Sequence, residues 1–596
     1  MKRYESAIHA LRDVYGYEAF RGVQEKAIAS VMSQRDVFVL MATGGGKSLC
    51  YIIPCLACGM QGVVVSPLVS LMQDQVVSLQ ERGVSACYLG SSQPDPMIWD
   101  KLHTFQLIYV TPEMAATERF RQRLRTLQLA LVAVDEAHCV SEWGHDFRPE
   151  FRRLAELRQF VSCPFIAVTA TATPECRADI VHQLQLDGDV HCTSVDRDNL
   201  SFSALLKTKN CAESAALAIK SHLPSNGTTL VYVPTTDETE QIAEQLCQLG
   251  VVAAAYHAQR TPEERRSVHS DFLSDRLAVV VATLAFGMGI DKPDVRVVIH
   301  WGVPKSIEAY FQQAGRAGRD GDPARCVLHY QMADFAKLDK VFGVERETID
   351  RFRNYCQMRG GCRRAVLLRH FGEDTTLKCG KCDTCGNPTV DGTADVRLFL
   401  SATIACGNRC GVTTIVSLLR GTVKHEWLKS CPEHGSGTHR TDWESVSSAS
   451  HAAGLVERVG CKGRVGSYSA VALTEDGRLW MADATSTLSI ADAPSLAEES
   501  PDNSERSGIY IALVDCRRRL ANRLPPYMVC SNETLRQLAN MKPTSKDALL
   551  RVPGFGKVKV EKYGDVFLKC IRVHAINHEP EVESLLPPTL LDGGVR

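Results

Sequence analysis

The chain has 596 residues, which at ~150 residues per domain predicts about four domains rather than one. Apolar residues make up 44% and charged residues 23%, so long disorder, collagen-like repeats and a membrane-dominated protein are excluded. The 68 basic and 69 acidic residues leave a net charge of −1, which by itself gives no indication of a polyanionic partner.

The N-terminus and the cysteines indicate the compartment. Residues 1–6 mix charges without an apolar stretch, so we expect neither a secretory nor a transit peptide. The longest uncharged run, residues 48–73, is broken by prolines and glycines, which favours a helix, a turn and a buried strand over a membrane span. The 23 scattered cysteines are typical of a reducing compartment. We therefore predict an intracellular protein that does not associate with membranes.

Short β-branched runs alternate with amphipathic helical stretches through the first two thirds of the chain. Such runs are typical of buried parallel strands. Strand signals lapse between about 190 and 225 and then resume, which predicts two α/β lobes, residues 1–195 and 196–335. The expected strands are 36–41, 62–66, 107–110, 129–134 and 165–169 in the first lobe and 228–233, 278–281, 295–300 and 325–330 in the second.

A glycine-rich loop follows the first expected strand and leads into a helix. Lys47 in this loop would bind the β- and γ-phosphates of a nucleotide, and the Ser48 hydroxyl would hold Mg²⁺. The strict phosphate-loop pattern has glycine where Met41 stands, so an ordinary glycine-rich turn is the alternative. The residues whose backbone would cradle the phosphates are Thr43, Gly44, Gly45 and Gly46.

Two carboxylates follow the strand 129–134 in the tetrad Asp-Glu-Ala-His. Ligands of open α/β sheets bind at this carboxyl edge of the strands. Asp135 could hold the Mg²⁺, and Glu136 could orient and deprotonate the attacking water. A solvated acidic loop is the alternative, but the phosphate loop upstream favours the catalytic interpretation.

The second lobe contributes the sequence Gln-Ala-Gly-Arg-Ala-Gly-Arg over residues 313–319. Arg316 and Arg319 could place positive charge on the γ-phosphate, and Gln313 belongs to the same motif. An arginine finger of this kind can raise the rate ~10³- to 10⁵-fold. Supplied across a cleft, it would couple hydrolysis to lobe closure. The alternative is a solvated basic helix start.

The order of these motifs resembles superfamily 2 helicases and, in detail, the RecQ family of DNA helicases. Residues 17–24 are similar to the family's adenine-reading motif, which implies that Tyr17 stacks on the base while Arg21 and Gln24 contact the nucleotide. The resemblance covers about residues 10–575 and implies two RecA-like lobes that bind ATP. Further matching stretches are 66–75, 110–113, 168–173 and 281–291.

The segment 139–151 resembles the family's aromatic-rich loop. Trp143 and Phe147 offer flat faces for exposed bases, each stack worth ~1–3 kcal/mol. Arg148 and His145 are available for phosphate, and the adjacent Glu136 would let bound DNA reset the hydrolytic site. Packing of the two aromatics under the loop is the alternative.

Three cysteines, Cys379, Cys382 and Cys385, have the C-x₂-C-x₂-C spacing of a metal site. Four thiolates suit structural zinc, and the fourth ligand from spacing alone is either Cys356 or Cys362. The interval from 362 to 379 is similar to that of the RecQ-family zinc module, which implies Cys362. An iron–sulfur cluster is the rival. We assign this helical zinc-binding module to residues 336–389.

Residues 390–481 resemble the family's winged-helix module. The segment 455–459 is expected to return as 468–473 in a hairpin whose tip carries Lys462 and Arg464 for phosphate binding. No aromatic stands at the tip, so an ordinary turn is an equal alternative and strand separation by a stacked pin is in doubt.

The rest of the chain divides by charge. Residues 482–503 hold five acids and no base, which predicts a linker, and 576–596 form an acidic tail. Residues 504–575 resemble an HRDC bundle, and 505–574 carry 14 basic against 6 acidic residues. Within it, 552–559 resembles a helix-hairpin-helix turn in which Lys557 and Lys559 would contact DNA phosphates. A solvated basic face is the alternative.

These patterns predict an ATP-dependent DNA helicase of the α/β class, with ATP, Mg²⁺ and Zn²⁺ as cofactors. Its partner would be single-stranded, forked or branched DNA, and its location with the genome, in the nucleus of a eukaryote or the cytoplasm and nucleoid of a bacterium. Translocation from 3′ to 5′ is implied by the resemblance alone. Alternatives are an RNA helicase and a DNA-stimulated ATPase that translocates or anneals strands without efficient unwinding. A non-enzymatic scaffold is disfavoured because every motor residue is present.

Overall fold

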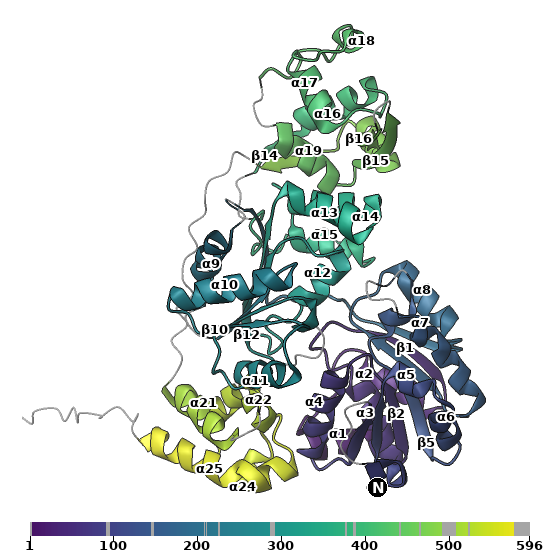
Figure 1. Ribbon diagram of the computed structural model, residues 1–596, viewed down its shortest axis with the longest axis vertical. Coiled ribbons are helices and arrows are strands. Elements are labelled where there is room, and N and C mark those ends of the chain that lie inside the picture. The colour runs from purple at the N-terminus through teal and green to yellow at the C-terminus, as the bar shows by residue number, and fades with distance from the viewer. Residues whose placement is uncertain are drawn as a thin grey trace, which may run out of the picture.

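The computed structural model describes residues 3–90, 96–142, 144, 148–207, 209, 211–224, 227–286, 292–375, 378–385, 389–439, 443–463, 466–491, 508–521 and 525–576. Figure 1 shows two α/β lobes, a helical module and a winged-helix module stacked beyond the second lobe, and a helical bundle that folds back beside both lobes. No helix of the described residues is both long and apolar enough to cross a membrane.

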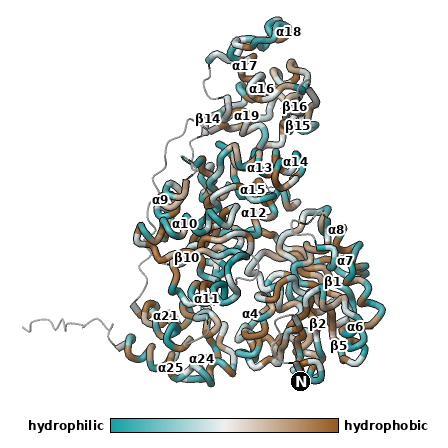
Figure 2. The backbone as a smooth tube through the Cα atoms, in the orientation of Figure 1, coloured by the Kyte–Doolittle hydropathy of each residue, from teal (hydrophilic) through white to brown (hydrophobic). Residues whose placement is uncertain are grey.

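The first lobe is a seven-stranded parallel sheet in the order β3-β4-β2-β5-β6-β1-β7. Its central strands are buried on both faces, as their apolar sequences require, and β1, β2 and β5 run through the brown, hydrophobic interior in Figure 2. The strands are β1 (Asp36–Leu40), β2 (Gln61–Val65), β3 (Ala86–Leu89), β4 (Leu107–Val110), β5 (Leu129–Val134), β6 (Phe165–Thr169) and β7 (Gly188–Cys192). The helices are α1 (Ala7–Tyr15), α2 (Gln24–Met32), α3 (Leu49–Cys58), α4 (Val69–Gln80), α5 (Pro112–Ala115), α6 (Glu118–Leu124), α7 (Pro149–Arg152) and α8 (Pro174–Gln183), with 3₁₀ turns η1 (Pro96–Trp99), η2 (Leu102–Thr104), η3 (Ala137–Val140) and η4 (Arg153–Gln159).

The second lobe is a six-stranded parallel sheet in the order β10-β11-β9-β12-β13-β8. The strands are β8 (Leu200–Leu206), β9 (Thr228–Tyr232), β10 (Ala253–Tyr256), β11 (Val279–Ala282), β12 (Val295–Trp301) and β13 (Ala324–Tyr330). The helices are α9 (Ala212–Ser221), α10 (Thr236–Gln248), α11 (Pro262–Leu273) and α12 (Ile307–Ala314), with the 3₁₀ turn η5 (Leu284–Phe286).

All nine strands expected from the sequence are present, with ends that differ by one residue at most. The expectation that strand signals lapse between 190 and 225 was wrong, because β7 and β8 lie in or at the edge of that interval. Strand β7 borders the sheet and alternates exposed with half-buried residues, so it lacks a continuous apolar run. Strand β8 borders the second sheet beside β13.

The helices α13 (Met332–Phe342), α14 (Arg346–Cys356) and α15 (Arg363–His370) follow the second lobe and lead to the winged-helix module. Its expected hairpin is confirmed: Val456 pairs with Leu473 and Val459 with Ala470. The elements are β14 (Thr389–Asp391), α16 (Thr393–Ala405), α17 (Val412–Leu419), α18 (Glu426–Lys429), α19 (Trp443–Ala452), β15 (Val456–Gly463), β16 (Gly466–Leu473), α20 (Glu475–Ala482) and β17 (Ser489–Ala491).

The acidic stretch 482–503 does not begin as a linker. Its residues 489–491 form β17, which pairs antiparallel with β14 and closes the winged-helix module. Ile490 is fully buried there, and its backbone pairing outweighs the polar, alanine-rich composition that predicted a linker. The part of this stretch after residue 491 lies outside the described residues.

In the described residues the C-terminal bundle has five helices, and it contacts both lobes. The Gly554 N–H donates to the Gly16 carbonyl 3.1 Å away, in the first lobe. On the second lobe, the Asn532 amide donates to Asp320 at 3.0 Å. In Figure 1 the bundle accordingly lies beside α11 and α4. Its helices are α21 (Gly508–Ala521), α22 (Pro526–Val529), α23 (Asn532–Met541), α24 (Lys546–Leu549) and α25 (Lys557–Ile576).

Candidate active site and metal centre

A polar cleft of about 300 Å³ lies between the two lobes. One wall comes from the loop after β1 and from the carboxyl end of β5, and the other from the end of α12 and the residues that follow it. Sequence-distant motifs therefore meet at one place. Among the lining residues are Thr43, Gly44, Gly46, Lys47, Ser48, Asp135, Glu136, His138, Gln312, Arg316 and Arg319.

The glycine-rich loop has a backbone that glycine alone adopts easily. Gly44 and Gly46 have φ values of +82° and +81°, in the left-handed region. A Cβ atom at Gly44 would lie 3.3 Å from the Arg319 carbonyl oxygen, so the loop touches the second lobe directly. The loop leads into α3, and Ser48 makes no side-chain capping bond to this helix in the described structure.

The Lys47 ammonium folds back onto its own loop, 3.4 Å from the Met41 carbonyl oxygen. Burial lowers the pKa of Lys47, and the carboxylates Glu136 and Asp135 act against that shift. A cation held in a glycine-rich loop that leads into a helix fits the polyphosphate of a nucleotide.

Gln24, which we expect to contact the nucleotide, is hydrogen-bonded to the phosphate loop in the described structure. Its amide nitrogen donates to the carbonyl oxygens of Gly45 and Gly46, each 3.1 Å away, and its Oε1 atom accepts from the Arg21 backbone at 2.9 Å. The side chain is only 2% exposed, and its hydrogen bonds stabilise the phosphate loop. Tyr17 stacks on Tyr15 at 6.4 Å, and Arg21 lies 5.7 Å from the Tyr17 ring centroid.

Asp135 and Glu136 lie at the floor of the cleft. Burial, followed by repulsion from Glu136, raises the pKa of Asp135 to about 7. A buried carboxylate that resists ionisation in this way fits a divalent cation, and together with the Ser48 hydroxyl it offers the oxygen ligands that Mg²⁺ prefers. Glu136 has a φ of +50°, an uncommon value for a residue with a side chain and one that clusters at functional sites.

His138 is a site residue to which the sequence analysis assigned no role. Its Nδ1 atom lies 3.4 Å from the Glu136 carboxylate and 3.1 Å from the Thr169 hydroxyl at the end of β6. The ring is buried, so it connects the acidic tetrad to the next strand. Its place as the fourth residue of that tetrad was the only available signal.

Arg316 and Arg319 both line the cleft, as the sequence indicated. Burial lowers the pKa of the Arg316 guanidinium, which lies in the field of Tyr232, Arg319 and Glu136. Arg197 donates to the Gly315 carbonyl oxygen at 2.7 Å and so stabilises the turn between α12 and Arg316.

Gln313 does not line the cleft. It is 4% exposed, and its Oε1 atom lies 2.9 Å from Nε2 of His300 inside the second lobe. The neighbouring Gln312 takes the place in the cleft. The helical period explains the difference, because consecutive residues of α12 face directions about 100° apart.

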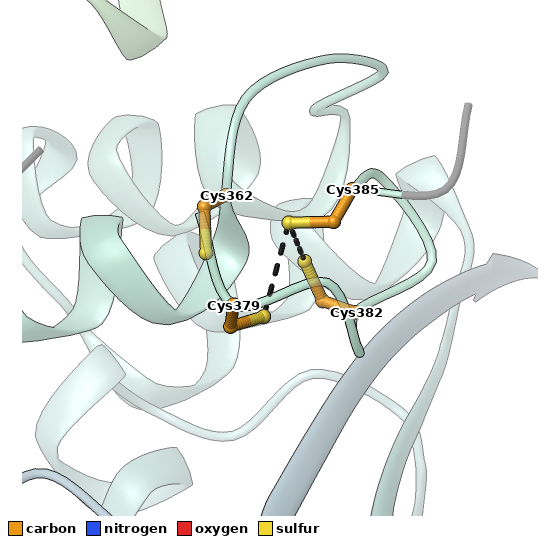
Figure 3. A group of neighbouring side chains, drawn as sticks. All are labelled: Cys362, Cys379, Cys382 and Cys385. Atoms are coloured by element: carbon orange, nitrogen blue, oxygen red, sulfur yellow. Dashed lines mark hydrogen bonds between the residues drawn. The ribbon is translucent and has the colours of Figure 1, made fainter. Parts of the chain in front are cut away.

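The four expected metal ligands form one cluster. The Sγ atoms of Cys362, Cys379, Cys382 and Cys385 all lie within 4.8 Å of one another and converge on one point in Figure 3. The 3.8 Å between Cys379 and Cys385 is about the edge of a zinc–thiolate tetrahedron with ~2.3 Å bonds. Cys356, the alternative fourth ligand, is buried at the end of α14 and is not part of this cluster.

An ion pair and a hydrogen bond of Asp383 connect the metal cluster to the second lobe. The buried Arg363 forms an ion pair with the partly exposed Asp383, which lies between two of the ligands. The Asp383 carboxylate also accepts from the Ala204 backbone at 3.0 Å, on strand β8. Loss of the metal would therefore loosen the edge of the second sheet.

Of the residues expected to contact DNA, several lie outside the described part of the chain, and others form contacts within the protein. Trp143, His145, Phe147 and Arg464 lie outside the described residues, and only the backbone of Lys462 is described. Arg148 donates to the Pro67 carbonyl oxygen at 3.0 Å.

The expectation that Lys559 contacts DNA is not supported by its position. Lys559 is 5% exposed and donates to the Met528 carbonyl oxygen at 2.7 Å, because it lies on the inner face of α25. Lys557 is exposed but pairs with Asp13 of α1 at 3.1 Å. The turn expected to bind phosphate is thus docked on the first lobe.

Comparison with known families accounts for almost the whole chain. The family models that match are DEAD/DEAH box helicase over 21–179, helicase conserved C-terminal domain over 213–321, RecQ zinc-binding over 328–386, RQC domain over 387–492 and HRDC domain over 507–571. These matches confirm the expected order of two helicase lobes, a zinc module, a winged-helix module and an HRDC bundle.

Curated relatives match at full length. The chain is 34% identical over 602 residues to the ATP-dependent DNA helicase RecQ of Haemophilus influenzae, which covers 96% of both chains. It is 35% identical to the protein of the same name from Pasteurella multocida, covering 97% of this chain and 95% of that one. The Bacillus subtilis protein is 34% identical, covering 95% and 98%.

Proposed function

Because the chain belongs to the RecQ family of ATP-dependent DNA helicases, we propose that it hydrolyses ATP between its lobes and thereby moves along single-stranded DNA from 3′ to 5′, separating duplexes in recombination, repair and replication. The observation that carries the proposal is the meeting of Lys47, Glu136 and Arg316, from motifs up to 269 residues apart, around one cleft.

The motif residues that line the cleft divide the reaction between them. Lys47 and the loop N–H groups bind the phosphates, and Ser48 and Asp135 would hold Mg²⁺, which when bound supplies charge neutralisation to the phosphate oxygens. Glu136 takes the proton of the attacking water. Arg316 and Arg319 place positive charge where the transferred phosphoryl group gains negative charge.

The division of the site between two lobes makes hydrolysis depend on their closure. Phosphate-binding groups lie in the first lobe and the arginines in the second, so only the closed arrangement completes the site. Motion of one lobe against the other is then the step that shifts DNA. We assign the two lobes to residues 1–195 and 196–335. The tetrahedral zinc site would stabilise the helical module that supports them.

The DNA partner is proposed as single-stranded, forked or branched, with the protein located on the genome. Trp143 and Phe147 supply base-stacking faces by sequence, directly after the acidic tetrad. The adenine would contact Tyr17 and Arg21.

DNA-stimulated ATPase activity tests the proposal. Purified protein should hydrolyse ATP faster with single-stranded DNA than with a matched RNA, and Lys47→Ala should abolish hydrolysis. Forked, tailed and blunt duplexes with wild-type and Glu136→Gln protein then test unwinding. ATPase activity that does not respond to DNA would refute the proposal.

A second function is favoured by one observation, the absence of an aromatic residue between residues 460 and 466 at the hairpin tip. A translocating or strand-annealing ATPase needs no wedge between bases. Stimulation of ATPase by DNA without strand separation on any of the three duplexes would select this function.

A further inference from the structure

His300 lies at the carboxyl end of β12, in the interior of the second lobe. It is 1% exposed, and its Nε2 atom is 2.9 Å from Oε1 of Gln313 on α12. The bond therefore ties a central strand of the sheet to the helix whose following turn carries Arg316.

The direction of this hydrogen bond follows from its chemistry. Burial lowers the pKa of His300 to about 4, so the ring is neutral at physiological pH. The Gln313 oxygen can only accept, so Nε2 of His300 donates. Its Nδ1 atom is buried and has no hydrogen-bond partner among the residues that the structure describes. The single N–H of this ring is thus committed to Gln313.

Aromatic rings fix the orientation of His300 from two sides. Tyr232, at the end of β9, stacks on it with centroids 5.3 Å apart and planes at 25°. Tyr310, on α12 and six residues before Arg316, meets it edge-on at 4.9 Å. These two ring contacts hold the imidazole beside α12.

Tyr232 also lies in the electrostatic field of Arg316. The Arg316 guanidinium is near enough to the buried Tyr232 hydroxyl that each alters the other's pKa. His300, Gln313 and Tyr232 all line a separate cavity of about 100 Å³ inside the second lobe, whereas Arg316 lines the nucleotide cleft. These three residues therefore lie next to the arginine's helix but outside the nucleotide cleft.

We infer that His300 is a positioning residue for ATP hydrolysis: its hydrogen bond to Gln313 sets the rotation of α12 and so aims Arg316 at the nucleotide. The inference rests on the proposed function. Neither His300 nor Gln313 lines the nucleotide cleft, so their effect is expected on kcat and not on nucleotide binding.

The test is steady-state ATPase of the full chain with saturating single-stranded DNA. His300→Leu removes the donor, and Gln313→Met removes the acceptor at nearly constant volume. Each should lower kcat about tenfold, the scale of one buried hydrogen bond, while the KM for ATP changes less than twofold. His300→Gln, which retains a donor at the end of its side chain, should keep kcat within about threefold of wild type.

His329→Leu is the matched control. His329 is also buried, at 5% exposure against 1% for His300, in the adjacent strand β13, where it packs on Trp301 and His222. It should leave kcat unchanged. A general loss of packing in the second lobe would instead lower kcat in this variant as well, and that result would overturn the inference.

A double-mutant cycle separates positioning from stability. In an Arg316→Lys background, His300→Leu should cost less than a further twofold, because the arginine that it aims is already gone. Full additivity of the two losses would overturn the inference, as would wild-type kcat in both His300→Leu and Gln313→Met. A wild-type protein without ATPase activity would overturn the proposed function together with the inference.

Discussion

The contact between the C-terminal bundle and the first lobe makes a sharp prediction for Gly16→Ala. Gly16 caps α1 with φ +68°, and a Cβ atom there would lie 2.7 to 2.9 Å from the backbone N, C and O atoms of Phe555. Backbone atoms cannot rotate out of the way as the end of a side chain can. The bundle must therefore withdraw from α1.

The loss of docking free energy comes from two broken contacts, and the strain at position 16 is a separate loss of stability in the first lobe. Forcing alanine into a left-handed conformation costs ~1–2 kcal/mol and destabilises the first lobe alone. Withdrawal of the bundle additionally breaks the hydrogen bond from Gly554 to Gly16, worth ~0.5–1.5 kcal/mol, and separates Lys557 from Asp13, worth ~0–1 kcal/mol. Docking should thus weaken by about 1–2 kcal/mol, or roughly 5- to 30-fold.

Hydrogen exchange measured by mass spectrometry checks this result. Peptides that contain Gly554 should exchange roughly 5- to 30-fold faster in Gly16→Ala than in wild type. Gly343→Ala is the control, because Gly343 caps α13 with φ +62° and a Cβ atom there would meet nothing within 4 Å. Unchanged exchange at Gly554 in Gly16→Ala, or equal acceleration in Gly343→Ala, would refute the reasoning.

Three further predictions concern the metal, the pH response and the bundle. Cys382→Ser should release the bound zinc and destabilise the second lobe through Asp383. Metal analysis measures the zinc content, and a lower midpoint of thermal unfolding measures the destabilisation. A variant that keeps one zinc per chain would contradict the four-thiolate site. Burial, with His222 and Lys207, lowers the pKa of His329 to about 3, so the unfolded chain binds more protons below pH 6.5 and the free energy of unfolding falls as the pH decreases toward 3. In denaturant titrations, His329→Leu should therefore lose about 2 kcal/mol less than wild type between pH 7 and pH 5. Parallel pH profiles of the two proteins would contradict this prediction. Lys559→Met should leave DNA affinity unchanged, because Lys559 is buried, and a tenfold weaker affinity in fluorescence anisotropy would show that the bundle opens to expose it.

Local patterns predicted most of the chemistry. The glycine-rich loop, the Asp-Glu-Ala-His tetrad and the cysteine spacing are short motifs whose residues must be neighbours for the chemistry to occur. Buried strands such as β5 were equally visible, since a strand covered on both faces is apolar throughout. Strands at the sheet edge, such as β7, lack that signal because one side remains in water.

The sequence by itself determined which residue types are present for phosphate binding, hydrolysis and metal binding, because these depend on spacing along one segment. Tertiary structure alone decided which of them reach the cleft. Gln313 and Gln312 are adjacent in the sequence, yet the rotation of α12 sends one toward His300 and the other toward the nucleotide. Lys559 looked like a DNA contact in a basic segment and is buried, because the direction of a side chain depends on what packs against its helix, and no local pattern records that.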